Sequence, residues 1–145
     1  MPVFRRPVTI RFEEADARGV LFYGRLQALA HHVWEDFVVS ELVERWEDWF
    51  ESRDFVAPIK HAEATYHRPL RPGHSYVAEL TIGKVGESSL EVVTRFLDVS
   101  GPEPVLCAEA RVVKVLADPN TWKKIPIPAA IRQRLVKHLS GDRPV

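Results

Sequence analysis

Asp16 is the carboxylate best placed for chemistry, because it lies in a short loop seven residues before Tyr23, where a long helix is predicted to begin. The first turn of a helix presents unpaired backbone N–H groups and a partial positive charge. A carbonyl bound there is polarised while a nearby carboxylate attacks it or activates a water molecule, as acyl transfer requires. The alternative is a turn residue, since an aspartate shortly before a glycine, here Gly19, often bonds its own loop backbone.

Other side chains with catalytic potential are less well placed. Glu35 lies twelve residues after Tyr23, about 18 Å along a helix, so the two cannot contact one carbonyl within a single chain. An ion pair between Glu35 and His31, one turn earlier, is favoured instead. His31 and His32 point about 100° apart on a helix and do not chelate together, so we expect no catalytic metal. Cys107 lies in an apolar strand, which indicates a buried, inert thiol.

The first predicted elements follow from hydrophobic periodicity. Residues 8–12 alternate between apolar and polar side chains, which predicts a strand with one buried face. A long helix is predicted from about residue 24, with an apolar stripe formed by Leu26, Leu29, Ala30, Val33 and Phe37. A break near residue 39 and a second, shorter helix are expected after it, with Ser40 as a possible cap.

The rest of the chain reads mainly as strands. Runs rich in Val, Thr, Tyr and Phe predict four strands, near residues 55–67, 75–85, 88–98 and 104–116. Turns are indicated at residues 71–73, 86–87 and 100–102. Pro126 and Pro128 open a last short helix that is predicted to run through Leu139. This element order predicts an α+β fold in which an antiparallel sheet wraps around one long central helix.

Composition limits the possible partners. The chain has 145 residues, which indicates one domain over residues 1–145. Its 20 basic and 20 acidic residues give a net charge of zero, so no overall field attracts nucleic acid or an anionic membrane. No stretch reaches the roughly 20 apolar residues that cross a bilayer. A single cysteine and the absence of a signal-peptide pattern predict a cytoplasmic location.

Two segments resemble a known family. Residues 15–23 (ADARGVLFY) and 61–73 (HAEATYHRPLRPG) are similar to hot-dog-fold acyl-CoA thioesterases of the 4-hydroxybenzoyl-CoA thioesterase type, with Asp-x-x-Gly-Val as the most specific motif. Within that group, residues 31–35 and 58–62 are most similar to enzymes that hydrolyse 1,4-dihydroxy-2-naphthoyl-CoA. The resemblance spans roughly residues 7–139 and implies the hot-dog fold, whose element order matches the one predicted above.

The resemblance also implies roles for individual residues. The catalytic carboxylate of the family falls on Asp16, as nucleophile or as general base, and the backbone N–H that polarises the thioester falls on Tyr23. Relatives often carry histidine at Tyr23 and asparagine at Arg25, but a backbone N–H needs no particular side chain. No cofactor is implied, because coenzyme A is part of the substrate. Family sites lie between protomers, so a homodimer or a homotetramer built as a dimer of dimers is expected.

Contacts to the substrate are assigned to five further residues. Some relatives carry a basic cluster for the coenzyme A phosphates that aligns with residues 86–88, where this chain has none. Lys84, Ser88 and Arg68 are assigned to the phosphates instead, for their charge or hydroxyl group and their expected nearness to one turn. His61 and Thr65 share the polar face of the second strand and are assigned to a site at the subunit interface; a structural role for both is the alternative.

The function implied is hydrolysis of an aromatic or other acyl-CoA thioester to the free acid and coenzyme A. The substrates suggested are 1,4-dihydroxy-2-naphthoyl-CoA and 4-hydroxybenzoyl-CoA. The alternative is a non-catalytic module that binds acyl-CoA or an acyl carrier, because a fold alone does not establish turnover. A dehydratase of the same fold would place a histidine beside the central helix, and the loop offers Asp16 instead.

Overall fold

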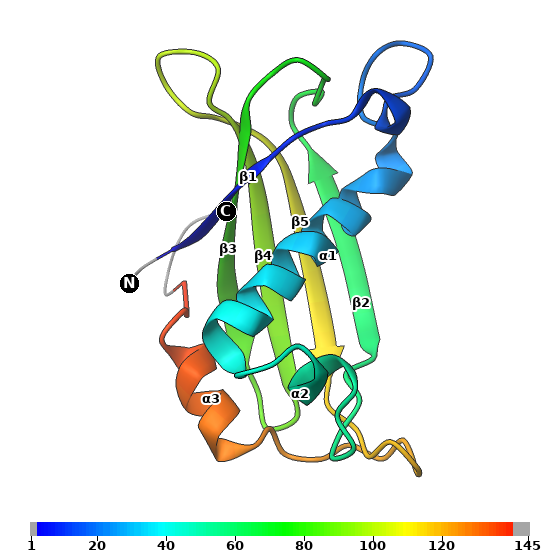
Figure 1. Cartoon of the computed structure of the whole chain (residues 1–145), viewed down its shortest axis with the longest axis vertical. Helices are drawn as coiled ribbons and strands as arrows, with labels where there is room; N and C mark the ends of the chain where they lie inside the picture. Colours follow the sequence, from blue (N-terminus) through cyan, green and yellow to red (C-terminus); the bar gives the residue numbers. More distant parts are fainter. Residues whose placement is uncertain (1–2, 141–145) are drawn as a thin grey trace.

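Helix α1 (Leu26–Phe37) lies diagonally across one face of a five-stranded antiparallel sheet (Figure 1). The computed structural model describes residues 3–140. The sheet order is β1-β3-β4-β5-β2, with bounds β1 (Phe4–Val8), β2 (Ile59–Tyr66), β3 (Tyr76–Val85), β4 (Ser89–Asp98) and β5 (Val105–Val115). This architecture is the hot-dog fold, so the predicted α+β class is confirmed.

The central helix forms where the apolar stripe predicts it. A single 3₁₀ turn, Tyr23–Arg25, leads into α1, and all five residues of the predicted stripe are buried against the sheet. The helix does not stop at its α-helical end but continues as one π-helical turn, Val38–Leu42. Ser40 therefore lies inside this turn and is not a cap, and the short second helix, α2, begins later, at Glu47–Phe50.

The first strand lies earlier than predicted. The predicted alternation of residues 8–12 holds only in part, since Ile10 is buried but Phe12, which was predicted on the same face, is exposed. A strand also needs a partner, however, and β1 pairs with β3 only from Phe4 opposite Leu80 to Val8 opposite Tyr76, where β3 begins. Beyond this point the chain has no neighbour to bond, and Phe12–Glu14 form a 3₁₀ turn.

The last helix, α3 (Ala129–Val136), begins directly after Pro128 but ends before Leu139, where the prediction placed its end. The chain leaves the helix because its next residues bond to the edge of β3. Ile82 donates its backbone N–H to the carbonyl of His138 and accepts one from Ser140, both at 2.9 Å. In the described part of the chain, no helix is long and apolar enough to cross a bilayer.

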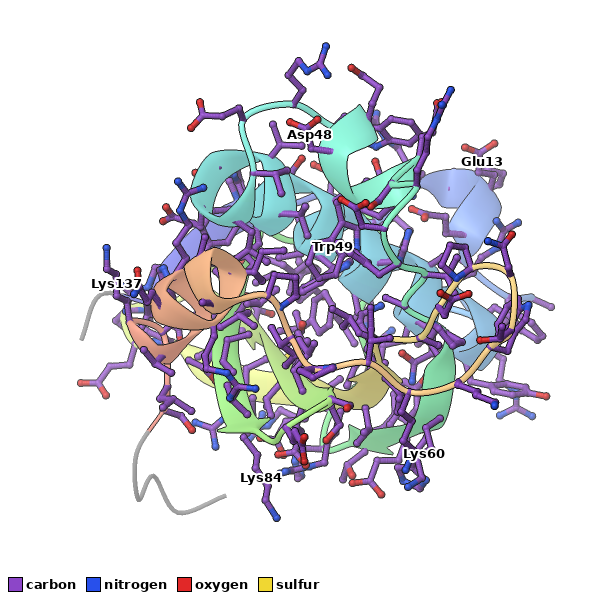
Figure 2. All side chains as sticks on the ribbon, turned by 90° about the horizontal axis from the view of Figure 1, so that it is seen from below. Glu13, Asp48, Trp49, Lys60, Lys84 and Lys137 are labelled. Carbon is purple, nitrogen blue, oxygen red and sulfur yellow. The ribbon has the colours of Figure 1, made fainter. Side chains whose placement is uncertain are left out.

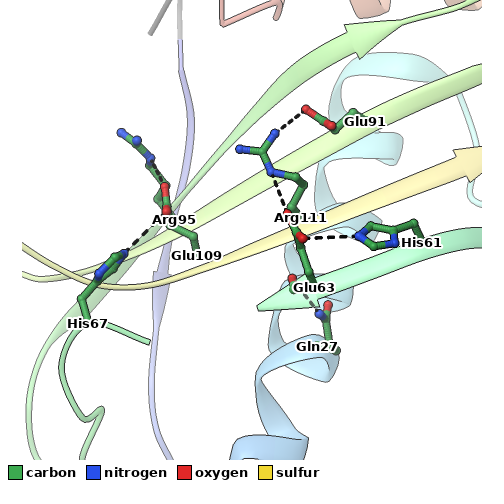
Figure 3. Close-up of polar contacts among 8 residues, drawn as sticks. All are labelled: Gln27, His61, Glu63, His67, Glu91, Arg95, Glu109 and Arg111. Atoms are coloured by element: carbon green, nitrogen blue, oxygen red, sulfur yellow. Dashed lines mark hydrogen bonds and ion pairs between the residues drawn. The ribbon is translucent and has the colours of Figure 1, made fainter. Parts of the chain in front are cut away.

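The face of the sheet turned away from α1 carries an ordered set of charges (Figure 3). Arg111 on β5 bonds Glu91 at 2.7 Å and lies 3.3 Å from Glu63. A second group lies nearby, in which Glu109 accepts from Arg95 at 2.8 Å and faces His67 at 3.6 Å. These pairs satisfy charges that the alternating strands direct to this face.

Strand β2 ends the sheet on one side. All eight of its residues are exposed, although its apolar and polar positions alternate. It bonds β5 along one edge, and no strand among residues 3–140 covers its other edge. An uncovered edge strand of this length is a site where another chain can add a strand.

Candidate active site

Asp16 lies in a tight loop that it helps to hold. Its Oδ1 accepts backbone N–H groups from Arg18 at 2.8 Å and Val20 at 3.4 Å, and the loop turns at Gly19 with a φ of +78°. Asp16 therefore stabilises its own turn, the role considered above as the alternative. The side chain is exposed and lines an open groove with Phe12. Within the described chain, Oδ2 accepts no hydrogen bond and is free to meet a substrate.

The loop and the start of the helix form one hairpin. Ala15 pairs with Leu21, and Phe22 donates its N–H to the carbonyl of Glu14 at 2.9 Å. Leu21 also donates to Leu70, in the connection after β2, at 2.7 Å. Tyr23 follows directly as the first residue of the 3₁₀ turn, so its N–H has no acceptor within the turn. The catalytic roles of Asp16 and Tyr23 remain predictions, but both residues belong to this hairpin.

Sequence reasoning missed Tyr66, which anchors the start of the helix. Its hydroxyl donates to the carbonyl oxygen of Tyr23 at 2.7 Å and so links the end of β2 to the turn before α1. Partial burial, and then the neighbouring Tyr23, raise the pKa of Tyr66, which keeps the hydroxyl protonated as a donor. A second link nearby runs from the Gln27 amide to the carbonyl of Glu63 at 3.2 Å. The parity of β2 was the available signal, since Tyr66 shares the inner face with Ala62.

The predicted phosphate contacts do not gather at one turn, which corrects that expectation. Arg68 bonds the carbonyl of Cys107 at the start of β5, whereas Ser88 bonds Leu116 just beyond its end. These points are about 30 Å apart along the strand, because the β2–β3 and β3–β4 connections leave opposite ends of the sheet. Lys84 lies with Ser88 and extends outward (Figure 2). Of the three residues assigned to the phosphates, Arg68 alone lies at the end of the sheet that carries Tyr23 in the same chain.

The residues assigned to a subunit interface lie on the uncovered edge strand. His61 and Thr65 are both exposed on the polar face of β2, and His61 lies 3.3 Å from Glu63 (Figure 3). Their contact with substrate remains a prediction.

Two other expectations about side chains are confirmed. Glu35 faces His31 at 3.5 Å, the ion pair predicted from their spacing on α1. Cys107 is buried, and burial raises the pKa of its thiol, which keeps it in the unreactive protonated form.

A cavity between α1 and the inner face of the sheet lies beyond the start of the helix. Its volume is about 90 Å³, and its walls are mostly apolar. The lining residues come from α1, β2, β4 and β5: Gln27, Ala30, His31, Trp34, Ile59, Ala62, Val92, Thr94, Val112 and Lys114. Lys114, which is only 6% exposed, lies on the inner face of β5. It was not among the predicted site residues.

The fold and the Asp16–Tyr23 hairpin together define a hot-dog protein of the thioesterase kind. Residues 10–135 match the Thioesterase-like superfamily, and the chain belongs to this family. The sequence is similar to a 1,4-dihydroxy-2-naphthoyl-CoA hydrolase from Rippkaea orientalis, at 28% identity over 88% of this chain and 91% of the relative.

Solved structures show the same fold. A 1,4-dihydroxy-2-naphthoyl-CoA thioesterase from Synechocystis has a TM-score of 0.78 at 20% identity, over 99% of this chain and 100% of that chain. A mutant 4-hydroxybenzoyl-CoA thioesterase in complex with 4-hydroxybenzoyl-CoA has a TM-score of 0.81 at 16% identity, over 92% and 98% of the two chains.

Proposed function

We propose that the protein hydrolyses the thioester bond of an aromatic acyl-CoA, with 1,4-dihydroxy-2-naphthoyl-CoA or 4-hydroxybenzoyl-CoA as the substrate. Thioester hydrolysis as the reaction class follows from membership of the family and from the similarity to hydrolases of this name. The observation that carries the proposal is the hairpin that connects the Asp16 loop directly to the N-terminal turn of α1.

Each part of this hairpin has a role in the proposed mechanism. The N–H of Tyr23 donates to the thioester carbonyl and stabilises the negative charge that develops on its oxygen. Oδ2 of Asp16 attacks the carbonyl carbon or removes a proton from an attacking water, while Oδ1 keeps the loop in place. As the C–S bond breaks, coenzyme A leaves as the thiolate and takes up a proton. Where water attacks, the free acid is released directly. Where Asp16 attacks, a mixed anhydride forms, and a water molecule then hydrolyses it to release the acid and restore the carboxylate. The reaction uses no metal and no bound cofactor.

The proposed active form is a homodimer, or a tetramer built from two such dimers. The uncovered edge of β2 supports this proposal, since antiparallel pairing of two copies satisfies its free backbone groups. Antiparallel pairing also brings the β3–β4 end of the partner toward Arg68, where a second chain can contribute phosphate contacts. A solution mass of two or four times 16.6 kDa is expected by light scattering, and a monomer mass contradicts the proposal. We propose a cytoplasmic location, which an acyl-CoA substrate supports.

Incubation of purified protein with a panel of acyl-CoA thioesters tests the function. A thiol reagent measures release of coenzyme A from naphthoyl, benzoyl and aliphatic esters. Faster release from the aromatic esters is expected. Tight binding without release of thiol identifies a non-catalytic acyl-CoA module instead and overturns the proposal.

A further inference from the structure

Phe12 is an apolar side chain that the fold leaves in solvent. The alternation of residues 8–12 predicts it on the buried face with Ile10, but β1 has already ended and Phe12 begins a 3₁₀ turn beside the start of α1 (Figure 1). It is 90% exposed, the largest value for a large hydrophobic residue in the described chain. Its ring is therefore available to another molecule.

Phe12 is not an isolated case. Phe22 and Tyr23, on the returning limb of the same hairpin, are 47% and 74% exposed. Three exposed aromatic residues thus belong to the hairpin that carries Asp16. Scattered apolar residues are normal on a surface, whereas apolar residues grouped in this way mark binding sites.

The turn holds Phe12 in a fixed position. Glu14 donates its backbone N–H to the carbonyl of Arg11 at 2.9 Å, and the Glu14 carboxylate accepts the Arg11 N–H at 2.7 Å. The carbonyl of Phe12 itself accepts the N–H of Ala15 at 3.2 Å. A ligand that packs on this ring therefore has little backbone freedom to remove, which lowers the entropic cost of binding.

Phe12 and Asp16 line the same open groove, which has a volume of about 630 Å³. Its walls also include Glu13, Ala15, Ala17, Gly19 and Pro72. Two of these seven lining residues carry carboxylates and none is basic. Such a groove repels the phosphates of coenzyme A and suits an uncharged part of the substrate, which is the acyl group.

The proposed reaction determines where the ring of an aromatic acyl group lies. Asp16 meets the thioester carbonyl carbon directly or through one water molecule. In a benzoyl or naphthoyl ester the ring is bonded to this carbon, so it lies beside Asp16, in the groove that Phe12 lines. Contact between two aromatic rings improves affinity about 2- to 10-fold beyond the burial of apolar area, and a saturated ring gains no such contact.

We propose that the ring of an aromatic acyl group packs on the Phe12 ring when its carbonyl is held at Asp16, so that Phe12 selects aromatic over saturated acyl groups. This inference rests on the proposed function for the position of the carbonyl. It makes Phe12 a residue of substrate specificity and leaves the chemical step to Asp16 and Tyr23.

Kinetics on a matched pair of substrates tests this selection. The acyl groups of benzoyl-CoA and cyclohexanecarbonyl-CoA each contain one six-membered carbon ring, but only the first is flat and aromatic. Phe12→Leu keeps an apolar side chain and removes the ring. It is expected to lower kcat/KM for benzoyl-CoA about 3- to 10-fold, through a higher KM, with little change for the saturated ester. Equal losses on both esters, or no loss on either, overturn the proposal.

Two further variants serve as controls. Phe12→Tyr keeps the aromatic ring and is expected to retain the wild-type values for both esters. Trp46→Leu removes an exposed ring just before α2, outside the groove, and is also expected to change neither value. A loss on benzoyl-CoA in Phe12→Tyr as large as that in Phe12→Leu contradicts a role for the ring.

A binding measurement separates this inference from the hydrolase proposal. Ketone analogues of the two esters, in which a methylene group separates the carbonyl from the sulfur, are not hydrolysed and report binding alone. By calorimetry, wild-type protein is expected to bind the phenyl ketone about 3- to 10-fold more tightly than the cyclohexyl ketone, and Phe12→Leu to lose this preference. A preference that is absent from the wild type, or that persists in Phe12→Leu, overturns the role of Phe12 even where thioesters are hydrolysed. A preference that depends on Phe12 supports it even where none is.

The competing occupant of the groove is a second copy of this chain, and light scattering distinguishes it. If a second copy covers Phe12, Phe12→Leu lowers the solution mass of the protein, and this result overturns the proposal. An unchanged mass together with the altered preference supports it. The melting temperature is expected to stay the same, because Phe12 is exposed in the folded chain.

Discussion

The hydroxyl of Tyr66 donates a hydrogen bond of 2.7 Å to the carbonyl oxygen of Tyr23, a residue 43 positions away in the chain. This bond joins the last residue of the edge strand β2 to the turn that begins the central helix. The carbonyl belongs to the turn that presents the Tyr23 N–H, so the position of that N–H depends on the edge strand. A partner that pairs with β2 is therefore connected to the candidate active site through the Tyr66 side chain.

Tyr66→Phe tests this connection. The variant keeps the ring and removes only the hydroxyl, so the loss of stability is expected to be about 1 kcal/mol. A larger relative effect is expected on catalysis, with kcat lowered about 3- to 10-fold and KM little changed, because the substitution loosens a group that acts on the transition state. Steady-state kinetics and thermal denaturation measure both. A loss confined to stability shows that the bond does not position the site.

Asp16 offers a test that separates chemistry from loop structure. Asp16→Asn retains the Oδ1 that accepts the N–H groups of Arg18 and Val20, so the loop and the melting temperature are expected to stay unchanged. The amide cannot attack or accept a proton, and kcat is expected to fall by about 10²- to 10⁴-fold. Asp16→Ala removes both functions and is expected to lower stability as well. Full activity in the Asn variant removes Asp16 from the mechanism.

Lys114 makes stability depend on pH. Burial lowers its pKa to about 8 from the ordinary value of 10.5, so the unfolded chain binds more protons than the native protein between these pH values. Stability of the native state is therefore expected to rise with pH through this range. At pH 7, Lys114→Met is expected to be more stable than wild type by about 2 kcal/mol, after allowing for the lost cation–π contact.

Comparing the wild type with Lys114→Met isolates the contribution of Lys114 to the pH dependence of stability. Tyr66, Tyr76 and Cys107 also have pKa values raised mainly by burial, but they are present in both proteins and cancel in the difference. Urea denaturation at several pH values between neutrality and pH 10.5 measures the difference, which is expected to shrink as pH rises. A constant difference over this range contradicts the assignment.

Glu109 is a charged residue on the outer face of the sheet whose partner matters for stability. The Glu109 side chain is 9% exposed and bonds Arg95 at 2.8 Å. Among residues 3–140, Arg95→Met leaves this carboxylate with the longer contact to His67 alone, so the free energy of unfolding is expected to fall by about 2 to 3 kcal/mol. Arg45→Met breaks the exposed pair with Asp48 and is expected to cost less than about 1 kcal/mol. Denaturant titration of both variants checks the contrast, and equal losses contradict it.

Local periodicity in the sequence was sufficient to predict most elements of the fold. The apolar stripe of α1 and the alternation of β3, β4 and β5 are properties of consecutive residues, and the structure places these elements close to their predicted bounds. The first strand was predicted too far along the chain, because its bounds depend on pairing with β3, which is distant in the sequence. No window of neighbouring residues contains that partner.

The sequence by itself determined the α+β class, the long buried helix and the loop that carries Asp16. Only the tertiary structure decided that Arg68 and Ser88 lie at opposite ends of the sheet, that Tyr66 bonds Tyr23, and that Lys114 is buried beneath the central helix. Periodicity states which face of an element is turned inward, but the groups that meet across the interior come from segments distant in the chain. Their meeting depends on strand order and register, which are set by the packing of the whole molecule.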